Sequence, residues 1–543
     1  MTPLKEIEEA FFETRLGHFP YSASLLGYTE YDTLMPSGTL SAYEKIIEQD
    51  REFLCQFEDL DESQMDFGDK ITKRVAVHQL EISLFIDEVL HHYRKNPDCA
   101  IQVSDALTSL FTRRTSDRFY PILARLEKSP QFITEFRTRV ITPVPLWRDV
   151  AIESAERLIL LLKSICEAAS KEIPPQDAEE IRDRALAVET HIKEYSTFLK
   201  GLAPSDISWA IDKEDYDTLL SLRKLPYTGD QILALGWKWY DEEKKRLAEL
   251  ASRIAPGTSV DYVMNSIKER HPPTFEDVLE LYRTCVKKSR QFIIDHDVLT
   301  LPEGEHYEVD VMPIHLRHIL PLAACFPAPV VGDERVGYLR VTPHDDPAFL
   351  REHSEPFIIN GCVHEGYPGH HVQLWCSGTH PDKVRWALIS GFSAKMVCSG
   401  PEMVEGWAHY CEELMMNLGF CNTLELQFIQ SRDVLWRAIR IIVDVSLSRG
   451  EMGFEEGVAF LMDMGMERPA AEGEVTWYSL LPTYPLSYLL GKNLLKDLKA
   501  RVKAKMGSSY TDKFFHDTVL YEGTMPLALL EEVFNNKIRT MST

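Results

Sequence analysis

The segment VAIESAERLILLLKSICEAASKEI, residues 150–173, decides the fold class of this chain of 543 residues. Its apolar residues recur at spacings of three and four with charged residues between them, which is typical of a helix that buries one face. The same pattern returns in AVHQLEISLFIDEVLHHY (76–93) and, after a proline start, in PPTFEDVLELYRTCVKKSRQFI (272–293). We therefore predict a mainly α protein whose residues 1–300 form a helical N-terminal region.

The pattern changes between about residues 305 and 345. HYEVDVMPIHLR (306–317) and RVGYLRVTP (335–343) alternate and are rich in β-branched and aromatic residues, which favours short strands. Turn-forming residues separate them, in FPAPVVGDE (326–334). We predict a small β-sheet here, within a second region, 301–543, that is otherwise helical.

Histidines and a glutamate gather directly after this sheet, in HEGYPGHH (364–371). Zinc peptidases of the HExxH type place two histidines one helical turn apart, so that both rings reach one metal ion while the intervening glutamate acts on water. We therefore predict that His364 is a zinc ligand and that Glu365 is the general base.

The second histidine ligand is displaced, because Pro368 occupies its usual position. In a regular helix His370 would be rotated by about 120° from the face of His364, and His371 would lie about 10.5 Å further along the axis. Pro368 removes a helical N–H and Gly369 accepts unusual backbone angles, so the segment can bulge by two residues. Such a bulge favours His370 as the second ligand, with His371 as the alternative.

A third ligand is expected from a later helix, PEMVEGWAHYCEELMMNLG (401–419). Glu405, His409 and Glu412 lie four and three residues apart and share one helix face. We predict that Glu405 binds the metal and that Glu412 orients a ligating histidine through its free N–H. The alternative is that these histidines and glutamates are solvated, or satisfied by hydrogen bonds in the core.

These two motifs, at 364–371 and 405–412, match the forms HExxPGHH and EGWxxYxE of the family called domain of unknown function 885. The chain resembles this family from end to end, since residues 23–43 and 515–532 are similar to its opening and closing segments.

The resemblance implies a gluzincin-like zinc metallopeptidase in which Glu405 is a ligand and Glu365 the base. The second motif also looks like the corresponding helix of thimet-type oligopeptidases, which implies a large helical, oligopeptidase-like fold with a small sheet beside the zinc-binding helix. In gluzincins the edge strand of that sheet binds the substrate backbone as an added strand. Tyr338–Val341 is the candidate for this edge, and an ordinary structural hairpin is the alternative.

Two segments depart from the family pattern. The form RAxRxxxDxGxH reads RAIRIIVDVSLS (437–448), in which Ser446 and Ser448 replace the glycine and the histidine, so the role of that histidine is open here. The form PGQALxYxxG reads PTYPLSYLLG (482–491), with three altered residues, Thr483, Tyr484 and Pro485. We expect a substrate preference that differs from the family average.

Two arginines could recognise a substrate. Arg437 and Arg440 lie three residues apart on one helix face and could clamp a carboxylate, as a carboxypeptidase requires. Alternatively, they pair with Asp433 and Asp444 on the same helix, which we slightly favour.

Tyr488 and His516 are candidates for stabilising the oxyanion of the tetrahedral intermediate, since gluzincins commonly present a tyrosine or histidine opposite the base. Buried tyrosines with satisfied hydroxyls are the common alternative.

Composition excludes several classes of function. The net charge is 59 − 84 = −25, which argues against nucleic acids and anionic membranes as partners. The ten cysteines form no CxxC pair, the first residues contain no apolar signal region, and no run of eighteen apolar residues occurs. We therefore predict a cytoplasmic protein.

Together these patterns predict zinc-dependent hydrolysis of peptide bonds in short peptides, by an oligopeptidase or carboxypeptidase with one Zn²⁺ per chain. One alternative is a metal-dependent hydrolase of a non-peptide amide. Another is a non-catalytic helical binding protein whose metal is absent or structural, with His371 or His409 as a fourth ligand. The oligomeric state is left open.

Overall fold

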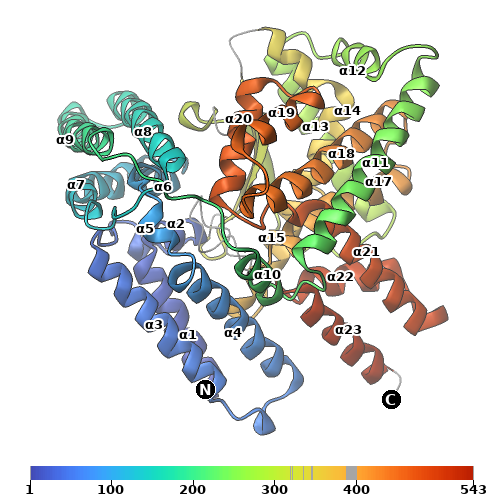
Figure 1. The fold of residues 1–543 in the computed structure, drawn as a ribbon, viewed down its shortest axis with the longest axis horizontal. Helices are drawn as coiled ribbons and strands as arrows, with labels where there is room; N and C mark the ends of the chain where they lie inside the picture. Colours follow the sequence, from blue (N-terminus) through green and yellow to red (C-terminus); the bar gives the residue numbers. More distant parts are fainter. Residues whose placement is uncertain are drawn as a thin grey trace.

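The computed structural model describes residues 2–317, 320, 322–333, 335–343, 347–386 and 400–541. Within this part of the chain, helices account for most of the residues and a small sheet interrupts them, which confirms the predicted mainly α fold (Figure 1).

The helices that precede the sheet are α1 (Pro3–His18), α2 (Pro20–Leu26), α3 (Leu40–Glu58), α4 (Phe67–Glu88), α5 (His92–Lys95), α6 (Cys99–Phe111), α7 (Phe119–Phe136), α8 (Pro145–Glu172), α9 (Pro175–Lys200), α10 (Lys213–Leu222), α11 (Gly229–Ile254), α12 (Val260–Lys268) and α13 (Phe275–Asp295). Side-chain caps begin several of them. Thr39 accepts the N–H of Ala42 at the start of α3, and Thr228 forms a capping box with Gln231 at the start of α11.

The sheet consists of β1 (Tyr307–Val311), β2 (Ala323–Phe326) and β3 (Gly337–Val341), in the order β1-β3-β2. β3 pairs with β1 in parallel and with β2 in antiparallel orientation. The predicted strands β1 and β3 are confirmed, whereas β2 was not predicted. The prediction of an edge strand at Tyr338–Val341 is wrong, because β3 lies in the middle of the sheet with a partner on both sides. The strand β2 has an outer edge, on the side that faces away from β3.

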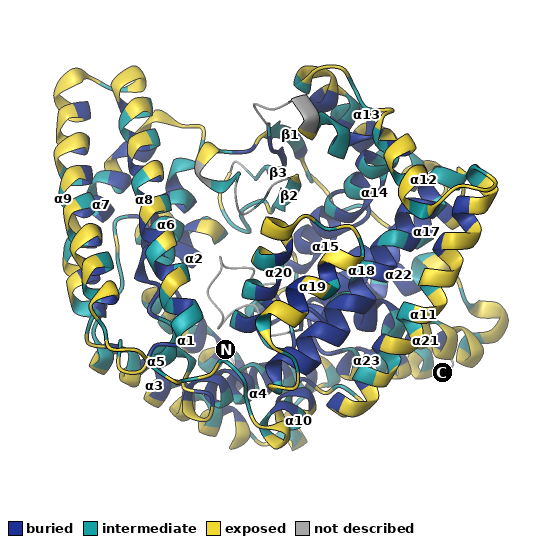
Figure 2. Ribbon diagram, turned by 45° about the horizontal axis from the view of Figure 1, so that its top comes forward, coloured by how far each residue is buried: buried dark blue, intermediate teal, exposed yellow. Residues whose placement is uncertain are grey.

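The helices that follow the sheet are α14 (Glu355–Glu365), α15 (His370–Ser377), α17 (Pro401–Asn417), α18 (Leu424–Ser448), α19 (Phe454–Asp463), α20 (Arg468–Leu480), α21 (Ser487–Met506), α22 (Asp512–Tyr521) and α23 (Leu527–Met541). Nearly all residues of α17 and α18 are buried, and Figure 2 shows both helices in dark blue. These two helices therefore form the interior against which the candidate site is built.

Several separate apolar clusters pack the described part of the chain. One joins α6 to α9 through residues such as Leu107, Ile133 and Leu158, and these helices gather at one side in Figure 1. Another joins α1 to the sheet and to α23, with Leu4 and Phe534 as its most distant buried members in sequence. The division at residue 300 stays a prediction.

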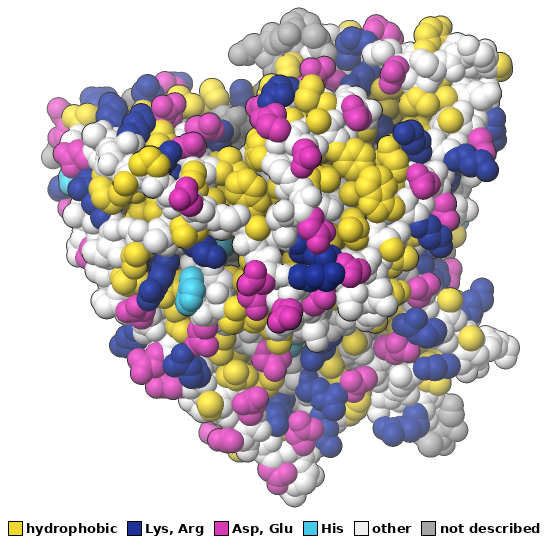
Figure 3. Space-filling view, viewed as in Figure 1, with side chains coloured by type: hydrophobic (Ala, Val, Ile, Leu, Met, Phe, Trp, Pro, Cys, Tyr) yellow, Lys and Arg dark blue, Asp and Glu magenta, His cyan; other side chains and the backbone are white. Residues whose placement is uncertain are grey.

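None of the described helices is both long and apolar enough to cross a membrane. Acidic and basic side chains intermingle over the face shown in Figure 3. The cysteines that the structure describes are free thiols.

Candidate metal centre

The first motif is a helix break rather than a bulged helix. α14 ends at Glu365, a short turn with a cis Tyr367–Pro368 bond follows, and α15 begins at His370. Gly369 is required in this turn, because a Cβ atom there would lie 1.9 Å from the carbonyl oxygen of His364. The predicted bulge was expected to bring His370 next to His364, and the break does so, because the ring centroids of the two histidines lie 4.8 Å apart.

The second motif holds this turn in place. The indole N–H of Trp407 donates to the carbonyl oxygen of Pro368 at 2.9 Å. Beside it, Gly406 lets α17 approach α21 closely, because a Cβ atom there would lie 2.5 Å from the backbone carbon of Gly491. The glycine and tryptophan of EGW are therefore packing residues that bring Glu405 towards the first motif.

His364, His370 and Glu405 converge in the fold. Their ligand atoms all lie within 4.8 Å of one another, and all three residues are buried. Glu405 Oε2 lies 3.4 Å from His370 Nε2 and 3.9 Å from His364 Nε2. Tetrahedral ligands at zinc distances are separated by roughly 3.3–3.5 Å. The separation of Glu405 and His370 therefore matches that of two zinc ligands, and that of Glu405 and His364 is longer, so the three donors could hold one zinc ion after the side chains adjust.

An unsatisfied carboxylate oxygen supports this fit. Glu405 Oε2 is buried and, among the described residues, has no hydrogen-bond partner. Burial disfavours the charge of Glu405, but His370 and His364 outweigh it and lower the pKa of Glu405 to about 2. Burial also opposes the charge of His370, yet Glu405 outweighs it and raises its pKa. The centre thus keeps a buried carboxylate ionised next to two imidazoles.

Glu412 takes the supporting position predicted for it. Its Oε1 lies 2.7 Å from His364 Nδ1, which directs the other ring nitrogen towards Glu405. Asn360 donates to the second oxygen of Glu412 at 3.0 Å and to Asp433 at 2.9 Å. The pKa of Glu412 is held well below its usual value because neighbouring His409 and His364 outweigh the effect of burial.

Glu365 lies beside the sheet. Its Oε2 accepts the backbone N–H of Cys325, in β2, at 2.8 Å, and its backbone carbonyl accepts the hydroxyl of Tyr307 at 3.0 Å. The residue is half-buried, unlike His364 next to it. The predicted base is therefore fixed by backbone contacts and still reaches solvent.

His371, the alternative ligand, is directed elsewhere. Its Nε2 lies 3.0 Å from Glu305 Oε2, and its ring stacks on Tyr307 at 4.1 Å. Arg290 and Tyr367 also donate to Glu305. The alternative with His371 as ligand is therefore not supported by the geometry.

His409, the other histidine considered as a fourth ligand, is not among the converging ligand atoms. It is fully buried, with Nδ1 3.3 Å from Glu412 Oε2. Burial lowers its pKa to about 3.

The two arginines are engaged in ion pairs. Arg437 lies 3.5 Å from Asp433, as the pairing alternative predicts. Arg440 pairs with Glu474 of α20 at 3.0 Å rather than with Asp444, so that part of the prediction is wrong. A carboxylate clamp on a substrate would require both pairs to open.

The tyrosine and the histidine predicted for the oxyanion have different positions. Tyr488 lies at the site, with the Arg440 guanidinium 4.6 Å from its ring centroid, and burial and Glu405 raise its pKa. His516 is fully buried, with Nδ1 2.7 Å from the carbonyl oxygen of Val298 and Nε2 2.8 Å from the Tyr410 hydroxyl. Both ring nitrogens are occupied, so a substrate contact by His516 is not supported.

Ser448 lies at the position where the family pattern has histidine. Its hydroxyl donates to Asp444 Oδ1 at 3.2 Å, deep in the core. The serine that stands here in place of histidine therefore makes a contact within the core, between two residues of α18.

Tyr484 is a site residue that the sequence did not reveal. Its hydroxyl donates to Glu405 Oε1 at 2.5 Å. Burial and the Glu405 carboxylate hold the pKa of Tyr484 well above its usual value, so the hydroxyl stays protonated. The only signal was its place among the altered residues of segment 482–491.

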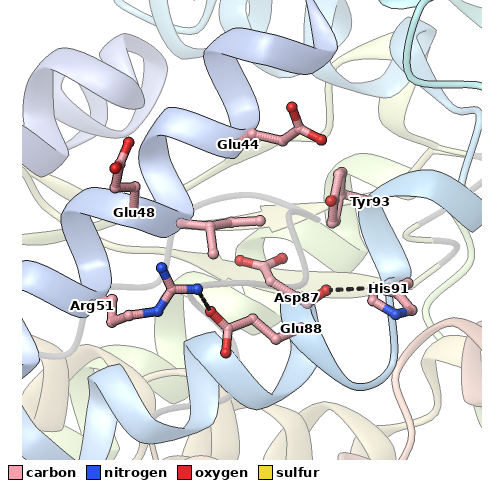
Figure 4. Close-up of a pocket in the computed structure, with 8 residues that line it drawn as sticks. Glu44, Glu48, Arg51, Asp87, Glu88, His91 and Tyr93 are labelled. Carbon is pink, nitrogen blue, oxygen red and sulfur yellow. Dashed lines mark hydrogen bonds and ion pairs between the residues drawn. The ribbon is translucent and has the colours of Figure 1, made fainter.

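A cavity of about 380 Å³ lies elsewhere, against α3 and the end of α4. Figure 4 shows two interactions among the residues that line it, between Arg51 and Glu88 and between His91 and the backbone of Asp87. It lacks the converging ligand atoms found at His364.

The sequence matches the family described as bacterial protein of unknown function (DUF885) over residues 20–534, and the chain belongs to that family. No curated protein matches it. A structure of a candidate lipoprotein of unknown function from Shewanella oneidensis is similar, with 18% identity, a TM-score of 0.76, and coverage of 98% of this chain and 100% of that one. A candidate lipoprotein from Colwellia psychrerythraea has 15% identity and a TM-score of 0.85, covering 99% and 100%. At these identities, the likeness shows a shared fold.

Proposed function

We propose that this protein is a gluzincin-like zinc peptidase that hydrolyses peptide bonds in short peptides. His364, His370 and Glu405 would hold one Zn²⁺, and Glu365 would act as general base. The observation that carries the proposal is the convergence of three buried ligand atoms from two motifs, with Glu412 behind one ligand and Glu365 beside the group. Location in the cytoplasm stays a prediction.

An open, catalytic site is favoured over a closed, structural one. Closing the site would require a fourth protein ligand, and His371 and His409 were the available donors. His371 contacts Glu305, and His409 faces Glu412. Structural zinc sites are normally closed by four protein ligands, whereas catalytic sites use three.

Zinc in such a site lowers the pKa of water towards about 7 and polarises a substrate carbonyl. Glu365 would accept a proton from the attacking water and deliver it to the leaving amine. The N–H of Cys325 fixes one oxygen of Glu365, so the proton would be exchanged through the other. Tyr488 would then stabilise negative charge on the reacting carbonyl oxygen.

The sheet edge supports a peptide as substrate. The carbonyl oxygen of Leu322 accepts the N–H of Thr342. In an antiparallel pair the backbone groups of alternate residues point to the partner strand, so those of Ala323 and Cys325 point away from β3, to the outer edge of the sheet. The contact between Cys325 N–H and Glu365 places this outer edge next to the base. An extended peptide that adds to β2 would present its backbone carbonyl groups there with little side-chain selectivity.

Glu365→Gln tests the proposal. This variant keeps the size of the side chain but cannot accept the proton, so peptide hydrolysis should fall by roughly 10²–10⁴-fold while the zinc content and fold are retained. Hydrolysis is measured by mass spectrometry on a mixed peptide library, with and without a chelator.

Glu355→Gln is the matched control, because Glu355 is an exposed glutamate in the first turn of the same helix. It should keep full activity. Full activity in Glu365→Gln would refute the assignment of the base.

A further inference from the structure

The turn between α20 and α21 is built to carry one side chain into the metal centre. Thr483 lies in it with φ +69°, in the left-handed region that β-branched residues rarely adopt. The Thr483 N–H donates to Asp444 Oδ1 at 3.0 Å, and Arg223 donates to the Thr483 carbonyl oxygen. A backbone held from two sides in an unfavourable conformation fixes the direction of the next residue, Tyr484.

The same arginine ties this turn to the helix that carries Glu405. Arg223 forms a buried ion pair with Glu402, which lies one turn before Glu405 on α17. It also donates to the hydroxyl of Ser487 at 3.0 Å. The turn and α17 are therefore clamped together, and the distance between Tyr484 and Glu405 is set by rigid elements.

The hydrogen bond between Tyr484 and Glu405 gives the two carboxylate oxygens of Glu405 different roles. The Tyr484 hydroxyl occupies Glu405 Oε1, while Oε2 faces His364 and His370 without a hydrogen-bond partner among the described residues. Trp477 packs against the Tyr484 ring with centroids 5.4 Å apart. A carboxylate that is held at one oxygen presents the other to a metal in a fixed direction.

We propose that Tyr484 is a positioning residue of the metal centre, which holds Glu405 so that Oε2 alone is presented to the metal. This inference rests on the proposed function, because it requires that Glu405 be a ligand. Without the hydroxyl, Glu405 would be free to rotate and to offer both oxygens.

Tyr484→Phe tests this role, since it removes the hydroxyl and keeps the ring. The zinc affinity, measured by competition with a chromophoric chelator, should fall about 10–100-fold, as it does when partners behind metal ligands are removed. The Co²⁺-loaded variant should also show weaker visible absorption bands, because a carboxylate that binds through both oxygens raises the coordination number. A change that affected only packing would leave these bands unaltered.

Tyr478→Phe is the matched control. It removes another buried tyrosine hydroxyl that donates to a carboxylate, that of Glu474, which is not among the three donors. Its zinc affinity and cobalt spectrum should equal those of the wild type, and thermal unfolding verifies that both variants fold.

A wild type that binds zinc, together with Tyr484→Phe of unchanged affinity and spectrum, would overturn the positioning role and leave the proposed function standing. Equal weakening in Tyr478→Phe would also overturn it. A wild type that binds no zinc would remove the proposed function and this inference together.

Discussion

His370 and His371 are neighbours in sequence, yet they belong to two buried clusters of opposite character. The first cluster, His364, His370 and Glu405, is open, because Glu405 Oε2 has no hydrogen-bond partner among the described residues. The second, His371 with Glu305, is closed, because Arg290, Tyr367 and His371 all contact the Glu305 carboxylate. Buried polar groups are normally satisfied, so the oxygen of Glu405 that faces two histidines without a hydrogen-bond donor points to a ligand in the open cluster.

Burial is similar in the two clusters, so it does not distinguish them. All three histidines and both glutamates have low exposure. What differs is the number of donors to each carboxylate, and this number decides whether a site stabilises the fold or keeps an atom available for binding.

Replacing each histidine in turn tests this comparison with the largest expected effect. His370→Ala should lose stoichiometric zinc and lower peptide hydrolysis by roughly 10³-fold or more, because metal catalysis contributes several kcal/mol. His371→Ala should retain zinc but lose about 1–3 kcal/mol of unfolding free energy, because it removes a hydrogen bond to the buried Glu305 carboxylate.

Metal analysis measures the zinc content of both variants, and denaturant unfolding measures their free energy of unfolding. The comparison fails if His371→Ala loses zinc while His370→Ala keeps it.

A third buried carboxylate, Asp444, sharpens the comparison through pH. Hydrogen-bond donors outweigh burial at Glu305 and lower its pKa, whereas burial raises the pKa of Asp444 to about 7. The folded state therefore holds a proton on Asp444 that the unfolded chain releases above its ordinary pKa of 3.8. Stability from this group is fully present below pH 3.8 and is lost as the pH rises through about 7.

Asp444→Asn resembles the protonated form and should remove this loss. Relative to the variant, the wild type should lose on the order of 4 kcal/mol between pH 4 and pH 8. Unfolding by urea at several pH values measures the difference. Parallel pH profiles for the two proteins would contradict the assignment.

The smallest expected effect concerns the packing that assembles the open cluster. Gly406→Ala would place a Cβ atom 2.5 Å from the backbone of Gly491, so α17 and α21 must separate. We expect a loss of about 1–3 kcal/mol in unfolding free energy, with weaker zinc binding because Glu405 and Tyr484 lie on the two sides of this crossing.

Gly473→Ala is the control, since Gly473 is an exposed helical glycine with nothing within 4 Å of an added Cβ. It should be neutral or stabilising by up to about 1 kcal/mol. Unchanged zinc affinity in Gly406→Ala would show that the crossing does not position Glu405.

The sequence predicts what depends on spacing within one segment. Apolar periodicity predicts the helices, and Pro368 and Gly369 within HEGYPGHH favour His370 over His371 as the partner of His364. The outcome at His370 follows because Pro368 and Gly369 are local determinants of the turn.

Contacts between distant segments could not be predicted in this way. Tyr484 and Glu405 are 79 residues apart in sequence, and Arg440 pairs with Glu474 of α20 rather than with an aspartate on its own helix. β2 has only four residues, too few for an alternation pattern, and its role depends on pairing with β3. In each case, tertiary packing overrides the local preference.

The most direct test is the position of the metal in a crystal of the protein grown with zinc. Anomalous scattering recorded on both sides of the zinc absorption edge locates the ion independently of the protein atoms. The account predicts one peak at about 2.0–2.2 Å from a ring nitrogen of His364, a ring nitrogen of His370 and Oε2 of Glu405. A zinc peak bound by His371 or His409 instead, or no peak beside Glu405, would contradict it.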